Sequence, residues 1–393
     1  MEPVTHLLTG GCLARAGFNR TAAYATMTMV VAAEFPDVDT LWSLRGPIEG
    51  FQHHRGITHT FLGLPFEAAF IVAAVYGWHR WRVRNGTGIS ELGGRVRGRI
   101  GKGSAAAPVR WGMLYGLALV GLLSHLLLDY TNNYGLRPFF PFVDKWYAAS
   151  IVFIFDPVIF AMLVAALTLP WLFGLVGSEV GAKRQTFPAR GWAIAALVGV
   201  AGWWGLREVE HGQAVQMAMG QSVAAPESGV DGLPTSQRRE MGQPDLVPRY
   251  LQAQRALASP DPLSPFRWSA VMDFGPMYQL AEVNTEGSGM LTMGETTYPK
   301  PGRSATVLEA EESKLGRVYM DWSAMPIVEV TRADGVLAGE GGKVVQVVTF
   351  RDPRFMGGWM RDAGRTALEG VVGLDASGKV VRETMDGRAE IDY

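Results

Sequence analysis

Histidine and aspartate recur in this sequence at spacings that suit metal binding. His125 and Asp129 are four residues apart in the run Ser-His-Leu-Leu-Leu-Asp. On a helix this spacing places both side chains on one face, where an imidazole and a carboxylate can hold one metal ion. A plain hydrogen bond between two helices is the competing interpretation. The pair therefore predicts a metal site only if other ligands join it.

Two upstream clusters offer such ligands. Asp37 and Asp39 lie one residue apart after an apolar segment, although Pro and Asp are also typical of a turn that ends a helix. Three of the seven histidines fall within seven residues, at His53, His54 and His59. This density is difficult to explain by packing alone, so we expect ligands in both clusters.

Two isolated residues could belong to the same site. His6 lies near the N-terminus in an apolar stretch, where a lone histidine is usually a packed core residue. Asp156 precedes Pro157 and could bind the metal, orient a ligand from the second shell, or cap a helix that starts at the proline.

The composition indicates what must position these residues. The chain has 393 residues, of which 19% are charged and 48% hydrophobic, with a formal net charge of −1. Soluble domains have about 25% charged residues, so part of this chain is expected to face lipid. A disordered chain and a basic nucleic-acid coat are excluded. The single cysteine, Cys12, excludes an internal disulfide and a cysteine-based zinc cluster.

Four apolar stretches match the length that about 30 Å of hydrocarbon requires of a helix. The alternative is that they are buried helices of a large soluble core. The N-terminus lacks a basic leader, so we expect no cleavable signal peptide. The four predicted transmembrane helices are Phe61–Trp78, Gly112–Leu128, Ile151–Val176 and Trp192–Leu206.

Charge sets the expected orientation. The loop His79–Arg110 carries eight Lys and Arg residues against one acid, which predicts a cytoplasmic loop, and Lys183, Arg184 and Arg190 fall on the same side. Residues 4–35 then fit a helical hairpin with both ends outside, or alternatively a single span. This topology brings six residues to one outer interface: Asp37, Asp39, His54, His59, His125 and Asp129.

The ordered motifs Pro36-Asp-Val-Asp39, His54-Arg-Gly-Ile-Thr-His59 and His125-Leu-Leu-Leu-Asp129 resemble the YdjM-like family. Its members are LexA-binding, inner-membrane-associated proteins described as metal-dependent hydrolases. The resemblance covers about residues 1–206. The motifs Pro262–Trp268 and Phe350–Phe355 resemble the extra domain of longer members.

That family is distantly similar to the zinc-dependent phospholipase C and single-strand nuclease group. The resemblance implies that Asp37 or Asp39 is an early carboxylate ligand, that His54 or His59 follows, and that His125 and Asp129 form a helix pair. His6 would match an N-terminal histidine ligand. This chain lacks a second clear His-x-x-x-Glu/Asp motif, which favours one or two ions over three.

These observations predict a membrane-bound hydrolase that uses a divalent metal, expected to be zinc, to act on a phosphoester or lipid-linked substrate. Whichever of Asp37 and Asp39 is not a ligand is a candidate general base. Arg55 is expected to bind an anionic substrate, and Thr58 to support the ligands. A non-catalytic scaffold with a structural metal is the alternative; a transporter would need polar residues at mid-membrane and repeated halves.

The fold class expected is an all-α polytopic membrane domain over residues 1–206, a linker over 207–262, and a small β-rich extracytoplasmic domain over 263–393. Alternating or β-branched runs indicate strands in three segments and a hairpin near the C-terminus. The predicted partners are the lipid bilayer, the substrate and a protein bound by the C-terminal domain, with no nucleic acid. The predicted strand segments are Arg267–Val283, Gly316–Val330 and Val344–Phe350, and the hairpin spans Ala367–Thr384, with a helical turn expected near Val307–Leu315.

Overall fold

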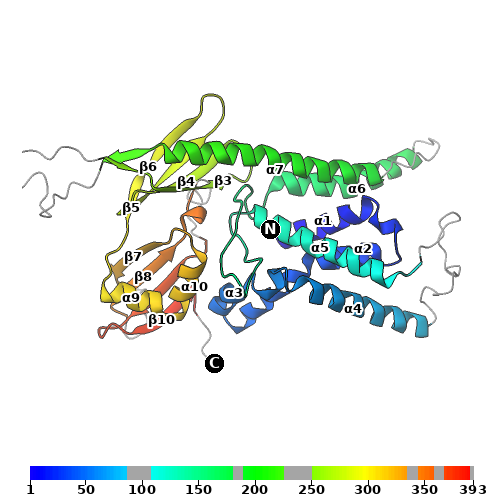
Figure 1. The fold of residues 1–393 in the computed structure, drawn as a ribbon, viewed down its shortest axis with the longest axis horizontal. Coiled ribbons are helices and arrows are strands. Elements are labelled where there is room, and N and C mark those ends of the chain that lie inside the picture. The colour runs from blue at the N-terminus through cyan, green and yellow to red at the C-terminus, as the bar shows by residue number, and fades with distance from the viewer. Residues whose placement is uncertain (86–107, 180–188, 225–249, 334–343, 358–366, 390–393) are drawn as a thin grey trace, which may run out of the picture. The chain divides into compact units, whose positions relative to one another are not determined.

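The protein consists of a helical unit followed by a β-rich unit (Figure 1). The computed structural model describes residues 1–85, 108–179, 189–224, 250–333, 344–357 and 367–389. The chain divides into two compact units, Met1–Glu208 and Val209–Tyr393. The expected helical N-terminal part and β-rich C-terminal domain are thus both present.

The N-terminal unit is made of α-helices joined by short 3-10 segments. One 3-10 segment, η1 (Phe18–Arg20), lies between α1 and α2. Three further short elements follow one another closely between α2 and α4: η2 (Phe35–Arg45), α3 (Pro47–His53) and η3 (Ile57–His59). The longer helices are α1 (Pro3–Arg15), α2 (Ala25–Glu34), α4 (Leu64–Arg84), α5 (Trp111–Thr131), α6 (Pro157–Glu179) and α7 (Ala189–Met219), the last of which continues into the second unit.

Glycines let α1 and α5 approach the same turn of α2. A Cβ atom at Gly10 of α1 would lie 2.8 Å from the carbonyl oxygen of Met29, and one at Gly121 of α5 would lie 2.9 Å from that same oxygen. Small residues at a helix contact allow the backbones to come this close. The result is a three-helix contact that brings His6 on α1 and His125 on α5 together.

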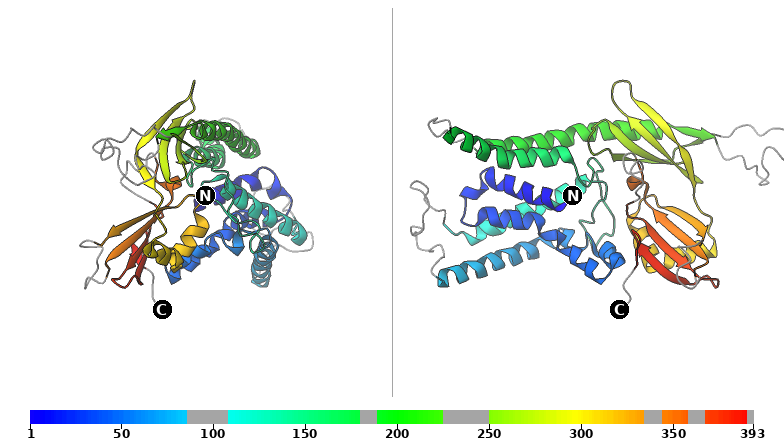
Figure 2. Two further views of the ribbon diagram at one scale, coloured as in Figure 1. Left: turned by 60° about the vertical axis from the view of Figure 1, so that its left-hand side comes forward. Right: turned by 180° about the vertical axis from the view of Figure 1, so that it is seen from behind.

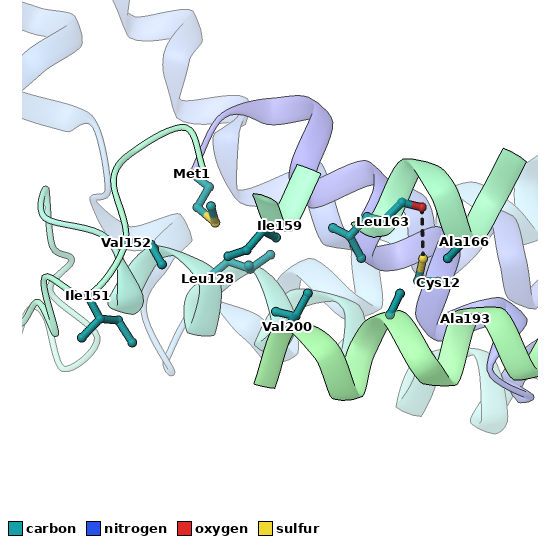
Figure 3. Close-up of a cluster of buried hydrophobic side chains, with 11 residues drawn as sticks. Met1, Cys12, Leu128, Ile151, Val152, Ile159, Leu163, Ala166, Ala193 and Val200 are labelled. Carbon is teal, nitrogen blue, oxygen red and sulfur yellow. Dashed lines mark hydrogen bonds between the residues drawn. The ribbon is translucent and has the colours of Figure 1, made fainter. Parts of the chain in front are cut away.

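A second core lies where α1, α6 and α7 meet. Figure 3 shows Cys12 of α1 beside Leu163 and Ala166 of α6, with Ala193 and Val200 of α7 in the same cluster. Cys12 is completely buried, and its thiol donates to the carbonyl oxygen of Leu163 at 3.8 Å. This core fixes α1 from the side opposite to α2.

The four predicted membrane spans are not confirmed as such. Among the described residues one helix, α5, is long and apolar enough by itself to cross a membrane. The segment Pro47–His59 and α4 would pass only as a pair, and they are bent by 85° at the break between them. The described apolar part of α6, Pro157–Phe173, is shorter than a span, and residues 151–156, predicted as helical, precede its first turn.

The charge pattern that set the predicted topology falls mostly outside the described residues. These exclude 86–107, which hold the centre of the basic loop His79–Arg110, and also Lys183 and Arg184. Arg15 and Arg20 do lie at the connection between α1 and α2, as the hairpin prediction requires. The inside and outside assignments therefore stay predictions.

The C-terminal unit contains two antiparallel sheets, which are separate in both views of Figure 2. The four-stranded sheet has the order β3-β4-β5-β6, and the five-stranded sheet the order β11-β10-β9-β8-β7. The strands are β3 (Arg255–Pro260), β4 (Arg267–Asp273), β5 (Met277–Asn284), β6 (Met290–Pro299), β7 (Ile327–Arg332), β8 (Gln346–Arg351), β9 (Gly370–Leu374), β10 (Val380–Met385) and β11 (Arg388–Ala389), with a separate pair β1 (Ser222–Ala224) and β2 (Tyr250–Gln252).

The C-terminal hairpin is confirmed, but two other predictions for this half are corrected. β9 and β10 pair antiparallel as expected. The predicted strand segment Gly316–Val330 begins in helix α10 (Lys314–Trp322), because Ser313 caps this helix and its apolar face is buried, and only its end from Ile327 lies in a strand, β7. The helical turn predicted near Val307–Leu315 is present as α9 (Ala305–Glu312). Residues 225–249 of the predicted linker 207–262 lie outside the described residues. Its start is the end of α7, where Ala, Gln and Met residues favour a helix, and its other described residues include strands β1 to β3.

Candidate metal centre

Four side chains from three elements converge in the N-terminal unit. They are Asp37 on η2, His59 on η3, and His125 and Asp129 on α5. One ligand atom from each lies within 4.8 Å of the others. His59, His125 and Asp129 are wholly buried, and the side chain of Asp37 is 11% exposed. We call these four residues the primary set.

The ligand atoms of the primary set lie close enough together to surround one point. His59 Nε2 lies 3.1 Å from His125 Nε2 and 3.3 Å from Asp37 Oδ1. Asp129 Oδ2 lies 3.4 Å from His59 Nε2 and 3.5 Å from His125 Nε2. The four-residue spacing on α5 produces this arrangement because one helical turn separates the two side chains.

The outer nitrogens of both imidazoles are held by acceptors. His125 Nδ1 lies 2.8 Å from the carbonyl oxygen of Ala33, and His59 Nδ1 lies 3.2 Å from Asp39 Oδ2. In a form that binds a metal, a proton on each Nδ1 would satisfy these contacts and would leave each Nε2 with a lone pair directed into the set, which is how histidine ligands are usually oriented.

The set therefore fits a cation. The Nε2 atoms of the two imidazoles and a carboxylate oxygen of Asp37 face one another, and Asp129 Oδ2 is buried without a hydrogen-bond partner. A buried, unpaired carboxylate oxygen is costly. A divalent metal ion would satisfy all four groups, and the mixed nitrogen and oxygen donors suit zinc and other first-row metals.

Asp39, predicted as a ligand or a base, supports His59 in this structure. Its Oδ2 accepts from the backbone N–H of Arg55 at 2.7 Å and from the Thr58 hydroxyl at 3.3 Å, besides facing His59 Nδ1. This favours an orienting role for that oxygen. Thr58 also lies 3.1 Å from His59 Nδ1, consistent with its predicted supporting position.

Arg55 does not face an open surface, and its predicted role in substrate binding stays a prediction. Its side chain is 3% exposed, and Nη2 donates to Asp129 Oδ1 at 2.8 Å. Nη1 donates to the carbonyl oxygen of Gly135 at 2.5 Å and to Asn132 Oδ1 at 3.2 Å, while the guanidinium lies 4.7 Å from the Tyr134 ring centre. The guanidinium instead fixes the carboxylate of Asp129.

Asn132 is a member of the site that the sequence analysis missed. Its Nδ2 donates to Asp129 Oδ1 at 3.3 Å, and its Oδ1 accepts from Arg55 and from the backbone N–H of Tyr134. The feature of the sequence that could have indicated this role is the position of Asn132 three residues after Asp129, where the helix ends.

His6 reaches the site but lies outside the primary set. Its ring stacks on His125 with centroids 3.8 Å apart, and its Nε2 lies 3.5 Å from Asp129 Oδ1. The amino group of Met1 contacts both His6 and Asp129. His6 thus packs against a member of the set instead of facing its centre.

Asp156 is elsewhere in the unit and caps a helix, one of the three roles considered for it. Its Oδ1 accepts from the backbone N–H groups of Val158 and Ile159 at 2.9 and 3.0 Å, and its Oδ2 accepts from Trp203 Nε1 at 3.0 Å. These partners stabilise the start of α6, with Pro157 as its first residue.

The electrostatics of the two η2 carboxylates favour their charged forms. Burial raises the pKa of Asp37, but interactions with His125 and His59 outweigh it, so its pKa lies below the usual range. Burial likewise raises the pKa of Asp39, and His54 and His59 lower it further than burial raises it. Both groups are therefore anionic at neutral pH, as metal ligands and their supports must be.

A protein-family match covers the part of the chain that carries this site. The profile of the family described as YdjM inner membrane protein matches residues 1–214, which include every residue of the site. The chain is also 25% identical over 182 residues to the uncharacterized protein YfhP of Bacillus subtilis (strain 168), an alignment that covers 44% of this chain and 47% of that protein. The matched region is thus about half the length of this relative. No solved structure matches the chain.

Proposed function

Because the chain belongs to the YdjM inner membrane protein family, we propose that its helical unit is a membrane-bound metal-dependent hydrolase. The observation that carries the proposal is the convergence of Asp37, His59, His125 and Asp129 on one point, with Asp129 Oδ2 otherwise unpartnered. In such a site a divalent ion supplies Lewis acidity, which lowers the pKa of a water molecule and polarises a phosphoryl oxygen.

The protein's own residues prepare the site in two steps. Asp39 and the Ala33 carbonyl fix the two imidazoles through their Nδ1 atoms. Arg55 and Asn132 fix Asp129 through Oδ1, which leaves Oδ2 directed at the set. Prior fixation of the ligands reduces the reorganisation needed during a reaction.

The surroundings favour an amphiphilic substrate such as a phospholipid or another lipid-linked phosphoester. The short elements that carry the ligands also expose large apolar side chains, with Leu41 60% and Leu44 73% exposed on η2, and Ile57 50% exposed on η3. Exposed apolar groups beside a polar site are typical of lipid-contacting surfaces. Arg45 on η2 is exposed beside them and suits a phosphate group.

A structural metal site is a second candidate, favoured by one observation. Three of the four residues in the primary set are wholly buried, and four protein ligands are typical of closed, structural zinc sites. In that case the unit would be a scaffold. The two functions differ in whether the loaded protein turns over a substrate.

The test is metal analysis and hydrolysis by the full chain purified in detergent. We expect bound divalent metal and hydrolysis of bis-p-nitrophenyl phosphate or of phospholipid in mixed micelles. His125→Ala and Asp129→Asn should lose the metal and at least about 100-fold in rate, since each removes a ligand. His53→Ala is the matched control, because that side chain is 39% exposed and pairs with Glu49 outside the primary set. Protein that binds metal yet hydrolyses none of these substrates would favour the scaffold.

A further inference from the structure

Two chain segments beside the candidate metal centre form one exposed apolar surface. The first is η3 with its connection to α4, and the second is the loop between α5 and α6. We propose that this surface lies in the headgroup region of a phospholipid bilayer and fixes the depth of the protein in the membrane. We call it the interfacial patch. Its members are between 42% and 81% exposed, and they are Ile57, Phe61, Leu62, Phe139, Phe142 and Val143.

The two segments of the interfacial patch are in direct contact. The backbone N–H of Phe61 donates to the carbonyl oxygen of Pro138 at 2.9 Å. The rings of Phe61 and Phe139 lie with their centroids 5.5 Å apart. The patch is therefore one surface and not a set of scattered side chains. Contiguous exposed apolar surface of this kind marks an interaction site.

The loop that carries half of the patch is held in a fixed shape. Leu136 and Tyr147 exchange two backbone hydrogen bonds of 2.9 Å. Between them, Arg137 Nη1 donates to Asp144 Oδ1 at 2.8 Å, and the Arg137 guanidinium lies 4.7 Å from the Trp146 ring centre. Because these contacts close the base of the loop, its exposed apolar side chains can enter lipid without a change of fold.

The length of α5 places the patch at a membrane surface. Among the described residues α5 is the helix that is long and apolar enough by itself to cross a bilayer. Its 21 residues correspond to about 30 Å, the thickness of the hydrocarbon core. The loop follows the C-terminal end of α5. The η3 segment is held at the same end, because His59 Nε2 lies 3.4 Å from Oδ2 of Asp129 in the last turn of α5.

The opposite end of α5 carries a matching group of aromatic and basic side chains. Trp111 is the first residue of α5, and its ring lies 5.0 Å from that of Tyr76 on α4. The guanidinium of Arg80 lies 5.8 Å from the Tyr76 ring centre, and that of Arg82 lies 5.3 Å from the Trp78 ring centre. Aromatic side chains at both ends of a span are typical of the two interfaces of a bilayer. A protein partner on the patch would not explain this second group, so lipid is the favoured occupant.

The charges of the loop suit a phospholipid headgroup. Lys145 is exposed two residues after Val143, and its ammonium lies 5.3 Å from the Tyr147 ring centre. A basic side chain at this level is attracted to lipid phosphates. Asp144 is paired with Arg137, so its charge does not oppose that contact. The candidate metal centre would then lie at the level of the headgroups, an inference that goes beyond the proposed function and does not require turnover.

The test measures the depth of a fluorophore attached to the patch. Cys12 is the single cysteine and is completely buried, so Phe142→Cys can be labelled selectively with a nitrobenzoxadiazole reagent. The full chain is reconstituted in vesicles of equimolar phosphatidylcholine and phosphatidylglycerol that carry a nitroxide near the ester bond or near the chain end. We expect stronger quenching by the shallow nitroxide, because interfacial side chains lie about 5–10 Å into the boundary between headgroups and acyl chains.

Two further variants complete the experiment. Val143→Cys labels a second position in the patch and should give the same order of quenching. Ala376→Cys, in the exposed turn between β9 and β10, is the control. Its label should be quenched by aqueous iodide and by neither lipid nitroxide.

Three results would overturn the proposal. The first is quenching by lipid nitroxides at positions 142 and 143 that is no stronger than at position 376. The second is stronger quenching by the deep nitroxide than by the shallow one. The third is a patch label that neither lipid nitroxide nor iodide reaches, which would indicate a protein partner in place of lipid. No metal or substrate enters the measurement, so each of these results leaves the hydrolase proposal standing.

Discussion

At the scale of single residues, the site depends on which atom of each side chain faces inward. A histidine orients its Nε2 only if Nδ1 has an acceptor, and a carboxylate presents one oxygen only if the other is held. Asp39 and Arg55 perform these tasks for His59 and Asp129. Their contribution is indirect. Substitution of either residue should therefore weaken metal binding more than it destabilises the fold.

Arg55 is the sharpest case for a substitution. Arg55→Lys keeps the charge but loses the planar fork that donates to Asp129, Asn132 and Gly135 at once. We expect metal affinity to fall about 10- to 100-fold, the usual effect of losing a group that orients a ligand. The measurement is the Kd for Co²⁺, together with the visible absorption of the bound cobalt.

The control for this prediction is Arg45→Lys, because Arg45 is exposed on η2 and stacks on Trp42. It should leave the Co²⁺ affinity and spectrum unchanged. If Arg55→Lys also binds Co²⁺ within about twofold of the wild type, with the same spectrum, Arg55 does not position Asp129.

At the scale of elements, the site requires close approach of α1, α2 and α5. Gly121→Ala places a Cβ 2.8 Å from that of Ala32 and 2.9 Å from a backbone oxygen, neither of which can move freely. We expect a loss of about 1–3 kcal/mol in the free energy of unfolding, typical of overpacking. Weaker metal binding should accompany the loss, since α5 carries His125 and Asp129.

Gly116→Ala on the same helix is the matched control for the glycine prediction. A Cβ there meets nothing within 4 Å, so the change should be neutral or stabilise by up to about 1 kcal/mol through helix propensity. Chemical denaturation followed by circular dichroism measures both variants. Equal stability of the two would contradict the close-approach argument.

The elements of this protein differ in how far the sequence alone predicts them. The pairing of His125 with Asp129 was predictable because helical periodicity is local. The roles of Asp39 and Arg55 were not predictable. The sequence around an arginine is the same whether its side chain contacts a substrate or a metal ligand. In the second unit, Leu315, Tyr319 and Trp322 of α10 have helical spacing, but the β-branched and aromatic residues around them also fit the predicted strand.

At the scale of the whole molecule, every residue of the proposed site lies in the first of two compact units. Metal binding should therefore stabilise that unit alone. We expect two unfolding transitions in calorimetry of the full chain. Chelation of the metal should lower the midpoint temperature of one of them. At an ion concentration of 100 times Kd the stabilisation lost is about 2.7 kcal/mol.

The single cysteine identifies the affected transition. Cys12 is completely buried in the first unit, so a maleimide should label it only after that unit opens. Labelling should begin at the temperature of the chelator-sensitive transition. In the His125→Ala variant, chelation should change the midpoint temperature of neither transition. A chelator effect on both transitions would contradict a site confined to the first unit.

The hydrogen-bonded partners of the site also dictate when it can form during synthesis. His125 contacts a carbonyl 92 residues earlier in the chain, and Arg55 contacts a carboxylate 74 residues later. Contacts this distant in sequence form late, because a long loop must close before they are made. A ribosome that has completed η3 has supplied Asp37 and His59 but neither ligand of α5. An ion held by the primary set could therefore be enclosed only after α5 has been made and has docked on α2, so metal loading would follow assembly of the helices.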